Sequence, residues 1–266
     1  MSSYTRLRFE SGSIARITLA RPEVRNAFDE GLIAELSQAL GELAGSIETA
    51  PERAPRAVVI TGEGKAFCAG ADMNWMKRSV GFTRVENEAD AGRFAAMLRA
   101  LDELPIPTVA RVNGACLGGG MGLIACCDVV VAVEWADFGF TEARLGIAPA
   151  VISTFVLPKI GASAARRYFL TGEIFKAAEA KAIGLVHEVV TPAELDAAVA
   201  RLTDGIAGNG PLAVAAAKRL IREGLALRRE EAIQNAVRTI AGLRASPEGQ
   251  EGLGAFLEKR PPSWKK

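Results

Sequence analysis

Hydrophobic and polar positions in the first third of the chain follow two different periods. Apolar residues alternate with polar ones over residues 7–9 and 14–19, which predicts two antiparallel strands that end at the turn of residues 21–22. Beyond that turn, apolar side chains recur at intervals of three and four, which predicts a helix with one buried face. Its apolar positions are Leu32, Leu36, Leu40, Leu43 and Ile47. A continuous apolar run, residues 57–62, then predicts a buried strand.

The middle of the chain alternates strand and helix patterns, and the last part is mostly helical. The pattern predicts a helix over residues 86–103 and strands over residues 108–112 and 128–133. After Gly146 helical patterns dominate, with one further strand predicted at residues 185–190. Strand–helix alternation followed by helices predicts one α/β core with a helical C-terminal region.

Composition supports an ordinary globular protein and excludes some partners. The chain has 266 residues, and 49% of them are hydrophobic, which is enough for a substantial core. Lys and Arg together number 32 against 31 Asp and Glu, so the net charge gives no overall electrostatic attraction to nucleic acid or to an anionic membrane. The N-terminal residues contain no apolar signal segment, and no apolar run approaches the roughly 20 residues that span a bilayer. We therefore expect a cytoplasmic protein that binds neither membranes nor nucleic acid.

The residues that most often bind metals show no metal-binding spacing. The four cysteines are Cys68, Cys116, Cys126 and Cys127, and the only histidine, His187, is far from them in sequence. We expect no metal site, and we interpret the cysteines as buried, reduced, small hydrophobic residues. His187 lies in a predicted strand, and we interpret it as structural.

Two turns rich in small residues carry the strongest chemical signal. In RVNGACLGGGMGLIACCD, residues 111–128, a strand runs through the glycines Gly118, Gly119 and Gly120 into a short helix. In KAFCAGADMN, residues 65–74, small residues follow the strand of residues 57–62 and lead to a helix start at Asp72. Without side chains, peptide N–H groups at a helix start can approach a bound oxygen closely. Together, the two segments predict two helix starts that face one anionic oxygen.

The segments AFCAGADM, NGACLGGGMGLIACCD and FTEARLGIAP, in this order, resemble the enoyl-CoA hydratase/isomerase (crotonase) superfamily. RPEVRNAF at residues 21–28 and AFLEKRPP at residues 255–262 extend the resemblance over nearly the whole chain. The residues of these segments are most similar to those of methylglutaconyl-CoA and isohexenylglutaconyl-CoA hydratases. The resemblance implies the α/β crotonase (ClpP/crotonase-like) fold, with repeated ββα units. It also implies a core with the acyl-CoA site over residues 1–200 and a helical trimerisation region over residues 201–266.

The resemblance also implies roles for three residues. In the family, a thioester carbonyl accepts two peptide N–H bonds that stabilise an enolate, and the matching donors here are Ala71 and Gly119. Glu142 matches the position of an acid or base near the α and β carbons of the acyl group. No cofactor is expected beyond the coenzyme A that forms part of the substrate.

For coenzyme A and the acyl group, the resemblance implies further contacts. The residues expected around coenzyme A are Arg25, Ala27, Ala69, Asp72, Leu117, Phe256 and Lys259, the last two in the same or a neighbouring subunit. Trp75 and Met76 fit either an acyl-pocket wall or core positions of a short helix. Lys77, Arg78 and Arg84 fit either partners of an acyl carboxylate or, as we favour, a solvated helix face.

The chain departs from the family at Gly122, where typical hydratases carry a second glutamate. Either the site merely lacks an acid there, or the space left by glycine serves the real substrate. We predict reversible hydration of a 2-enoyl-CoA with a branched or carboxylated acyl group, as in leucine degradation or fatty-acid metabolism. The alternatives are a double-bond isomerase, which needs one base, and a non-catalytic acyl-CoA-binding or RNA-binding relative. A homotrimer or a dimer of trimers is expected.

Overall fold

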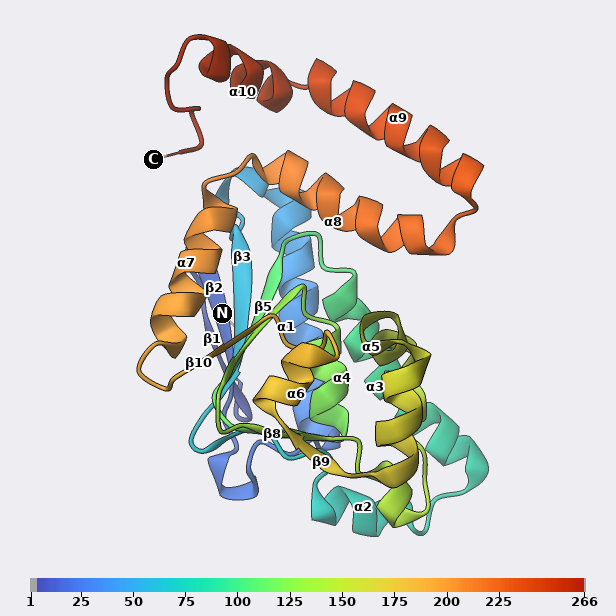
Figure 1. Cartoon of the computed structure of the whole chain (residues 1–266). Helices are drawn as coiled ribbons and strands as arrows, with labels where there is room; N and C mark the ends of the chain where they lie inside the picture. Colours follow the sequence, from blue (N-terminus) through green and yellow to red (C-terminus); the bar gives the residue numbers. More distant parts are fainter. Residues whose placement is uncertain (1–3, 266) are drawn as a thin grey trace.

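The computed structural model describes residues 4–265, and its larger β-sheet has six strands in the order β1-β2-β3-β5-β7-β10 (Figure 1). All neighbouring strands in it run parallel except β1 and β2, which are antiparallel. The strands are β1 (Leu7–Glu10), β2 (Ile14–Leu19), β3 (Ala57–Gly62), β5 (Thr108–Val112), β7 (Val129–Val133) and β10 (Glu188–Val190). Because β3, β5 and β7 are apolar along most of their length, helices can cover both faces of this sheet.

A second sheet is built from four strands of three residues each. They are β4 (Ala66–Cys68), β6 (Ala115–Leu117), β8 (Asp137–Gly139) and β9 (Ile174–Lys176), in the order β4-β6-β8-β9. Three of them directly follow strands of the larger sheet, so the chain runs β3-β4-α2, then β5-β6-α4, then β7-β8-α5. This is the ββα repeat of the predicted crotonase fold, which the structure confirms.

Helices surround the two sheets and form a separate group at the C-terminal end. They are α1 (Glu30–Thr49), α2 (Met73–Ser79), α3 (Arg84–Asp102), α4 (Gly119–Ala125), α5 (Ala150–Thr171), α6 (Ala177–Ala182), α7 (Leu195–Ala207), α8 (Pro211–Ala226), α9 (Arg229–Ala245) and α10 (Pro247–Leu257), with the short 3-10 helices η1 (Pro22–Val24), η2 (Pro51–Arg53) and η3 (Glu142–Leu145). In Figure 1, α9 and α10 lie at the top of the molecule and α2 at the bottom. The boundary predicted after residue 200 lies inside α7, and this helix packs against β3, β5 and β7 of the larger sheet.

The hydrophobic pattern predicted the long elements well and missed some ends. The antiparallel pair β1–β2, helix α1 and strand β5 occur where they were predicted. The strand predicted at residues 185–190 contains only its last three residues, because the N–H groups of Leu185 and Val186 both donate to Ala180 O in a turn. Asp128 lies outside β7, where its carboxylate accepts a hydrogen bond from Thr108 N at 2.7 Å.

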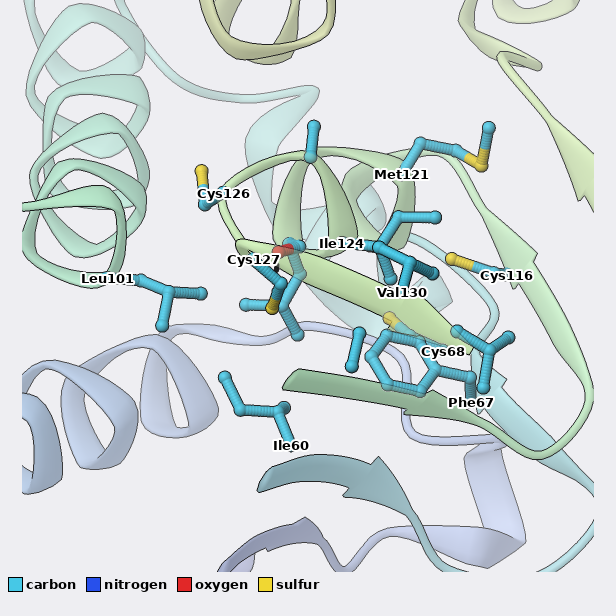
Figure 2. Packing of buried hydrophobic residues seen from close by; sticks show 14 of the residues in the cluster. Ile60, Phe67, Cys68, Leu101, Cys116, Met121, Ile124, Cys126, Cys127 and Val130 are labelled. Atoms are coloured by element: carbon cyan, nitrogen blue, oxygen red, sulfur yellow. Dashed lines mark hydrogen bonds between the residues drawn. The ribbon is translucent and has the colours of Figure 1, made fainter. Parts of the chain in front are cut away.

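The hydrophobic core is one cluster that includes residues of both sheets and of α1, α3, α4 and α5. Figure 2 shows Ile60 of β3 and Val130 of β7 in the same cluster as Met121 and Ile124 of α4. All four cysteines are free and buried in this region, as predicted, and burial raises the pKa of Cys68 to about 12. Residues 4–265 contain no group of His, Cys, Asp and Glu that could hold a metal ion and no helix able to cross a membrane.

Candidate active site

One cavity of about 280 Å³ is lined by Ala71, Gly119 and Glu142, the three residues predicted to be catalytic. Apolar side chains make most of the remaining wall. The full lining is Phe28, Ala71, Trp75, Ala91, Phe94, Gly119, Glu142, Ala148, Pro149, Ala150, Val151 and Ile152. A mostly apolar hollow with a few polar groups is typical of a small-molecule site.

The two predicted oxyanion donors follow adjacent parallel strands at equivalent positions in the register. Strands β4 and β6 are parallel, and Cys68 is the register partner of Cys116. Ala71 lies three residues after Cys68, and Gly119 lies three residues after Cys116. Because parallel strands end at the same sheet edge, the two turns emerge side by side into the cavity that both residues line.

The peptide group between Gly70 and Ala71 is held so that its N–H is available. Gly70 O accepts a hydrogen bond from Phe28 N at 2.7 Å. The N–H of a planar trans peptide points opposite to its C=O, so the Ala71 N–H points away from the Phe28 backbone. No acceptor within residues 4–265 bonds this N–H. Helix α2 begins two residues later, and its N-terminal end favours a negative charge nearby.

The peptide group between Gly118 and Gly119 has a similar arrangement at the start of α4. Gly118 O accepts a hydrogen bond from Met121 N at 2.9 Å, and Gly119 N has no acceptor in the described part of the chain. Gly118 has φ 49° and ψ −120°, a conformation that requires glycine. Two N–H groups at helix starts, neither with an acceptor among the described residues, therefore border one cavity, as an oxyanion site needs.

Glu142 places a carboxyl group beside this second donor. A Cβ added to Gly118 would lie 3.6 Å from Oε1 of Glu142, so the carboxyl group lies next to the peptide that carries the Gly119 N–H. Oε2 of Glu142 is buried and has no hydrogen-bond partner within residues 4–265. Burial raises the pKa of Glu142 above its ordinary value. A carboxylate of increased proton affinity suits a group that takes up and returns a proton.

The position of the missing second glutamate is filled by a neighbouring side chain. A Cβ added to Gly122 would lie 2.3 Å from Cγ2 of Ile152 and 3.2 Å from Cδ1 of Leu98. Ile152 is buried and lines the cavity, whereas Gly122 does not. Of the two alternatives for Gly122, the one in which the space left by glycine serves the substrate is contradicted, because Ile152 occupies that space.

The residues predicted for coenzyme A fall into two separate groups. Arg25 and Ala69 lie together, since Ala69 N donates to Arg25 O at 3.0 Å, and Ala27 and Asp72 belong to the same two turns. Leu117 lies in β6, directly before the second turn. None of these five lines the cavity, and the Asp72 carboxylate is used to cap α2 and to bind Arg21.

Phe256 and Lys259 form the second group, and the structure does not bring them to the cavity within one chain. Phe256 lies in α10 and is 80% exposed, and Lys259 follows this helix. Helix α10 and the cavity-lining helix α2 lie at opposite ends of the molecule in Figure 1. Of the two arrangements expected for them, this separation favours contact with coenzyme A in a neighbouring subunit.

The sequence allows two interpretations of Trp75 and Met76, either an acyl-pocket wall or core residues of a short helix. Trp75 lines the cavity, and Met76 does not. The three basic residues predicted as a solvated face are also absent from the lining. Arg78 pairs with Glu30 at 2.6 Å, and Arg84 pairs with Glu88 at 2.8 Å. Lys77 is exposed on α2, so this face matches the reading that we favoured.

His187 has a structural contact, as expected. Its Nδ1 accepts a hydrogen bond from Val130 N at 3.0 Å, which joins the segment before β10 to β7. Burial, with a smaller effect of the Lys159 charge, lowers the pKa of His187. Sequence reasoning did not assign the other wall residues to the site, among them the large apolar side chains of Phe28, Phe94, Val151 and Ile152.

Comparisons with known proteins point to one family. The sequence profile described as enoyl-CoA hydratase/isomerase matches residues 9–266. The 2,3-dehydroadipyl-CoA hydratase of Escherichia coli is 34% identical over 252 residues, which are 94% of this chain and 94% of that protein. The short-chain-enoyl-CoA hydratase of Clostridium acetobutylicum is 32% identical over 257 residues, again 94% of each. The crystal structure of an enoyl-CoA hydratase from Shewanella pealeana matches with a TM-score of 0.91 and 37% identity, covering 98% of this chain and 96% of that one.

Proposed function

Because the chain belongs to the enoyl-CoA hydratase/isomerase family, we propose that it catalyses the reversible hydration of a 2-enoyl-CoA thioester. The observation that carries this proposal is the cavity in which one carboxyl group meets two peptide N–H groups that have no acceptor in the described part of the chain. The relatives named as hydratases in Escherichia coli and Clostridium acetobutylicum support the same reaction.

In the proposed mechanism the thioester carbonyl oxygen accepts hydrogen bonds from Ala71 N and Gly119 N. The Glu142 carboxylate takes a proton from water as the water oxygen bonds to C3. The electron pair of the C2–C3 double bond moves toward the carbonyl and forms an enolate, which the two N–H groups stabilise. Glu142 then returns its proton to C2 as the carbonyl re-forms. Each donor contributes about 2.7–4 kcal/mol, by comparison with the removal of oxyanion donors elsewhere.

For the acyl group, we propose a short chain that is branched or carboxylated. The apolar side chains of Phe28, Phe94, Val151 and Ile152 suit a branched hydrocarbon in a cavity of about 280 Å³. The relative named 2,3-dehydroadipyl-CoA hydratase supports a carboxylated group. Since no basic side chain within residues 4–265 lines the cavity, a terminal carboxylate would have to extend beyond it.

A double-bond isomerase is the second candidate, and the filled position at Gly122 favours it. An isomerase needs one base to move a proton between two carbons, and Glu142 is the only ionisable side chain in the cavity lining described. The two candidates share the enolate and differ in whether water is added.

Mass spectrometry of coenzyme A thioesters tests the proposal directly. The pure protein is incubated with crotonyl-CoA and with 3-methylglutaconyl-CoA. Gain of one water by either thioester supports hydration, and gain by the second alone supports a carboxylated substrate. If neither mass changes while the double bond moves, the protein is an isomerase. Binding without any change would leave an acyl-CoA-binding protein, and a salt-sensitive RNA complex would indicate an RNA-binding one.

We also propose that the protein assembles as a homotrimer or a dimer of trimers through its C-terminal helices. Large apolar side chains on α8, α9 and α10 are exposed in the single chain. They include Leu212, Ile221, Leu225, Ile233, Val237, Ile240, Leu253, Phe256 and Leu257. An exposed apolar face of this kind is typical of a protein interface. Assembly would also supply the neighbouring subunit that Phe256 and Lys259 need in order to reach coenzyme A.

A further inference from the structure

The β-ladder that aligns the two donors ends before it reaches them. The last register pair of β4 and β6 is Cys68 with Cys116, and each donor lies three residues further along its chain. Catalysis by two N–H groups requires a fixed separation between them, because they bind one oxygen. Beyond the ladder, Gly70 packs against Gly118, but the described residues form no hydrogen bond between the two turns. A further contact is therefore needed to fix the Ala71 turn against the start of α4.

Phe28 makes that contact on the Ala71 side through its backbone. Phe28 N donates to Gly70 O at 2.7 Å, and Asp72 N donates to Phe28 O at 2.8 Å. These two bonds form an isolated parallel bridge between Phe28 and Ala71. The peptide groups on both sides of Ala71 are thus fixed, and with them the direction of the Ala71 N–H.

The ring of Phe28 makes the contact on the Gly119 side. A Cβ added to Gly119 would lie 3.2 Å from Cδ2 of Phe28, so the Gly119 Cα rests against this ring. Phe94 packs edge-to-face on the same ring, with centroids 5.2 Å apart and planes at 67°. Phe28 is only 1% exposed, so its ring has little freedom to move.

Arg21 clamps the segment that carries Phe28. Its Nη1 donates to Ala27 O at 2.5 Å, and its Nη2 lies 3.1 Å from Oδ2 of Asp29 and 2.9 Å from Oδ2 of Asp72. The other oxygen of each carboxylate caps a helix: Oδ1 of Asp29 accepts from Leu32 N, and Oδ1 of Asp72 accepts from Asn74 N, both at 2.7 Å. One guanidinium group therefore joins the starts of α1 and α2 on the two sides of Phe28.

This clamp is largely shielded from solvent. The side chain of Arg21 is 14% exposed, and those of Asp29 and Asp72 are 11% and 5% exposed. Burial alone would raise the pKa of Asp72, but hydrogen bonds from Asn74 N–H and from Arg21 outweigh it and lower the pKa. Buried, hydrogen-bonded ion pairs hold a defined geometry better than exposed ones do.

From these contacts we propose that Phe28 is the positioning residue that sets the separation of the Ala71 and Gly119 N–H groups, and that Arg21 holds Phe28 in place. The inference rests on the proposed function, because it concerns the same oxyanion site. Phe28 touches both donors at once, through its backbone on one side and its ring on the other.

The test compares Phe28→Leu with Phe175→Leu, which removes a similarly buried ring from β9 without touching either donor. Acetoacetyl-CoA serves as the probe, because its enolate carries the charge that the two N–H groups bind and absorbs in the near ultraviolet. Butyryl-CoA measures binding of an uncharged thioester. We expect Phe28→Leu to weaken binding of the enolate by about 10- to 100-fold, since small misplacements of reacting groups have effects of this size. Phe28 also lines the acyl cavity, so butyryl-CoA binding should weaken too, but by a clearly smaller factor than enolate binding.

The proposal is overturned if Phe28→Leu weakens enolate and butyryl-CoA binding equally, or if Phe175→Leu has the same effect at the same loss of thermal stability. Arg21→Gln should resemble Phe28→Leu, and Arg21→Lys should restore part of the enolate binding, because an ammonium group can still pair with one carboxylate. If Arg21→Gln does not fold, the comparison of Phe28→Leu with Phe175→Leu still decides, because it does not depend on Arg21. The enolate measurement needs no turnover, so a failure of hydration would be distinguishable from a failure of this inference.

Discussion

At the scale of single residues, Glu142 is the side chain to which we assign the proton transfer of the proposed reaction. One oxygen of its carboxyl group is buried and has no hydrogen-bond partner within the described residues, and Glu142 borders the cavity. Glu142→Gln keeps the shape but removes the base, so we expect kcat for hydration to fall by about 10²- to 10⁴-fold. Steady-state kinetics with crotonyl-CoA measure this change in kcat. Glu134→Gln, at an exposed position, is the matched control, and full turnover by Glu142→Gln would exclude the assigned role.

Gly122 supports a second residue-scale prediction, because Ile152 packs directly against it. Adding a methyl group with Gly122→Ala places it 2.3 Å from Cγ2 of Ile152. We expect overpacking to cost about 1–3 kcal/mol of unfolding free energy, which exceeds the gain of about 1 kcal/mol in helix propensity.

Urea denaturation of a double-mutant cycle checks this expectation. In the Ile152→Ala background the clash with Cγ2 is gone, so Gly122→Ala should cost less than it does in the wild type. Equal costs in the two backgrounds would show that Ile152 does not restrict position 122.

At the scale of elements, His187 links strands of the larger sheet and makes stability depend on pH. Its Nδ1 must be unprotonated to accept the bond from Val130 N, and burial, with a smaller effect of Lys159, lowers the pKa of His187 in the folded state below its ordinary value of 6.5. Between the folded and unfolded pKa values the unfolded chain binds a proton that the folded chain does not, so falling pH favours unfolding. We therefore expect this contribution to be complete above about pH 6.5 and to be lost as the pH falls through the lowered pKa.

Urea denaturation at a series of pH values between neutral and mildly acidic conditions measures the effect. His187→Asn is the matched variant, because the amide oxygen of asparagine can accept the Val130 N–H bond without titrating. The difference in unfolding free energy between wild type and His187→Asn should change with pH in this window. A constant difference would contradict the assignment.

The elements also show which parts of the fold the sequence could predict. Long strands and helices such as β5 and α1 have enough apolar positions for their period to be recognised. The second sheet was not predicted as a sheet, because strands of three residues are too short for any period to appear. The kink in α5 at Gly161, with φ 68°, depends on one left-handed residue within a helical pattern and was also missed.

At the scale of the whole molecule, the exposed apolar face of α8 to α10 predicts assembly. We expect light scattering to give the mass of a trimer or of a multiple of it. Val237→Glu, on α9, should reduce this mass, because the interface would have to bury an unpaired charge. Val80→Glu, at another exposed position, next to α2, is the control and should leave the mass unchanged. A monomeric wild type would show that this face is not an interface between copies.

The cavity, too, is a property of the whole molecule, and this explains which of its residues were predictable. Ala71, Gly119 and Glu142 belong to sequence motifs, so the sequence alone was enough to indicate them. Val151 and Ile152 reach the cavity only because α5 packs against α4, and no local pattern reports that contact. The same packing fills the position beside Gly122, which could not be known from the glycine alone.

The two groups that would bind the developing charge belong to the main chain, and this affects how such a protein can evolve. Every residue except proline carries a peptide N–H, so almost no point mutation in the gene can delete either donor. The walls formed by Phe94, Val151 and Ile152, in contrast, change with every substitution. Inheritance of the fold therefore preserves the chemistry, while drift in the walls is free to change which acyl group is accepted.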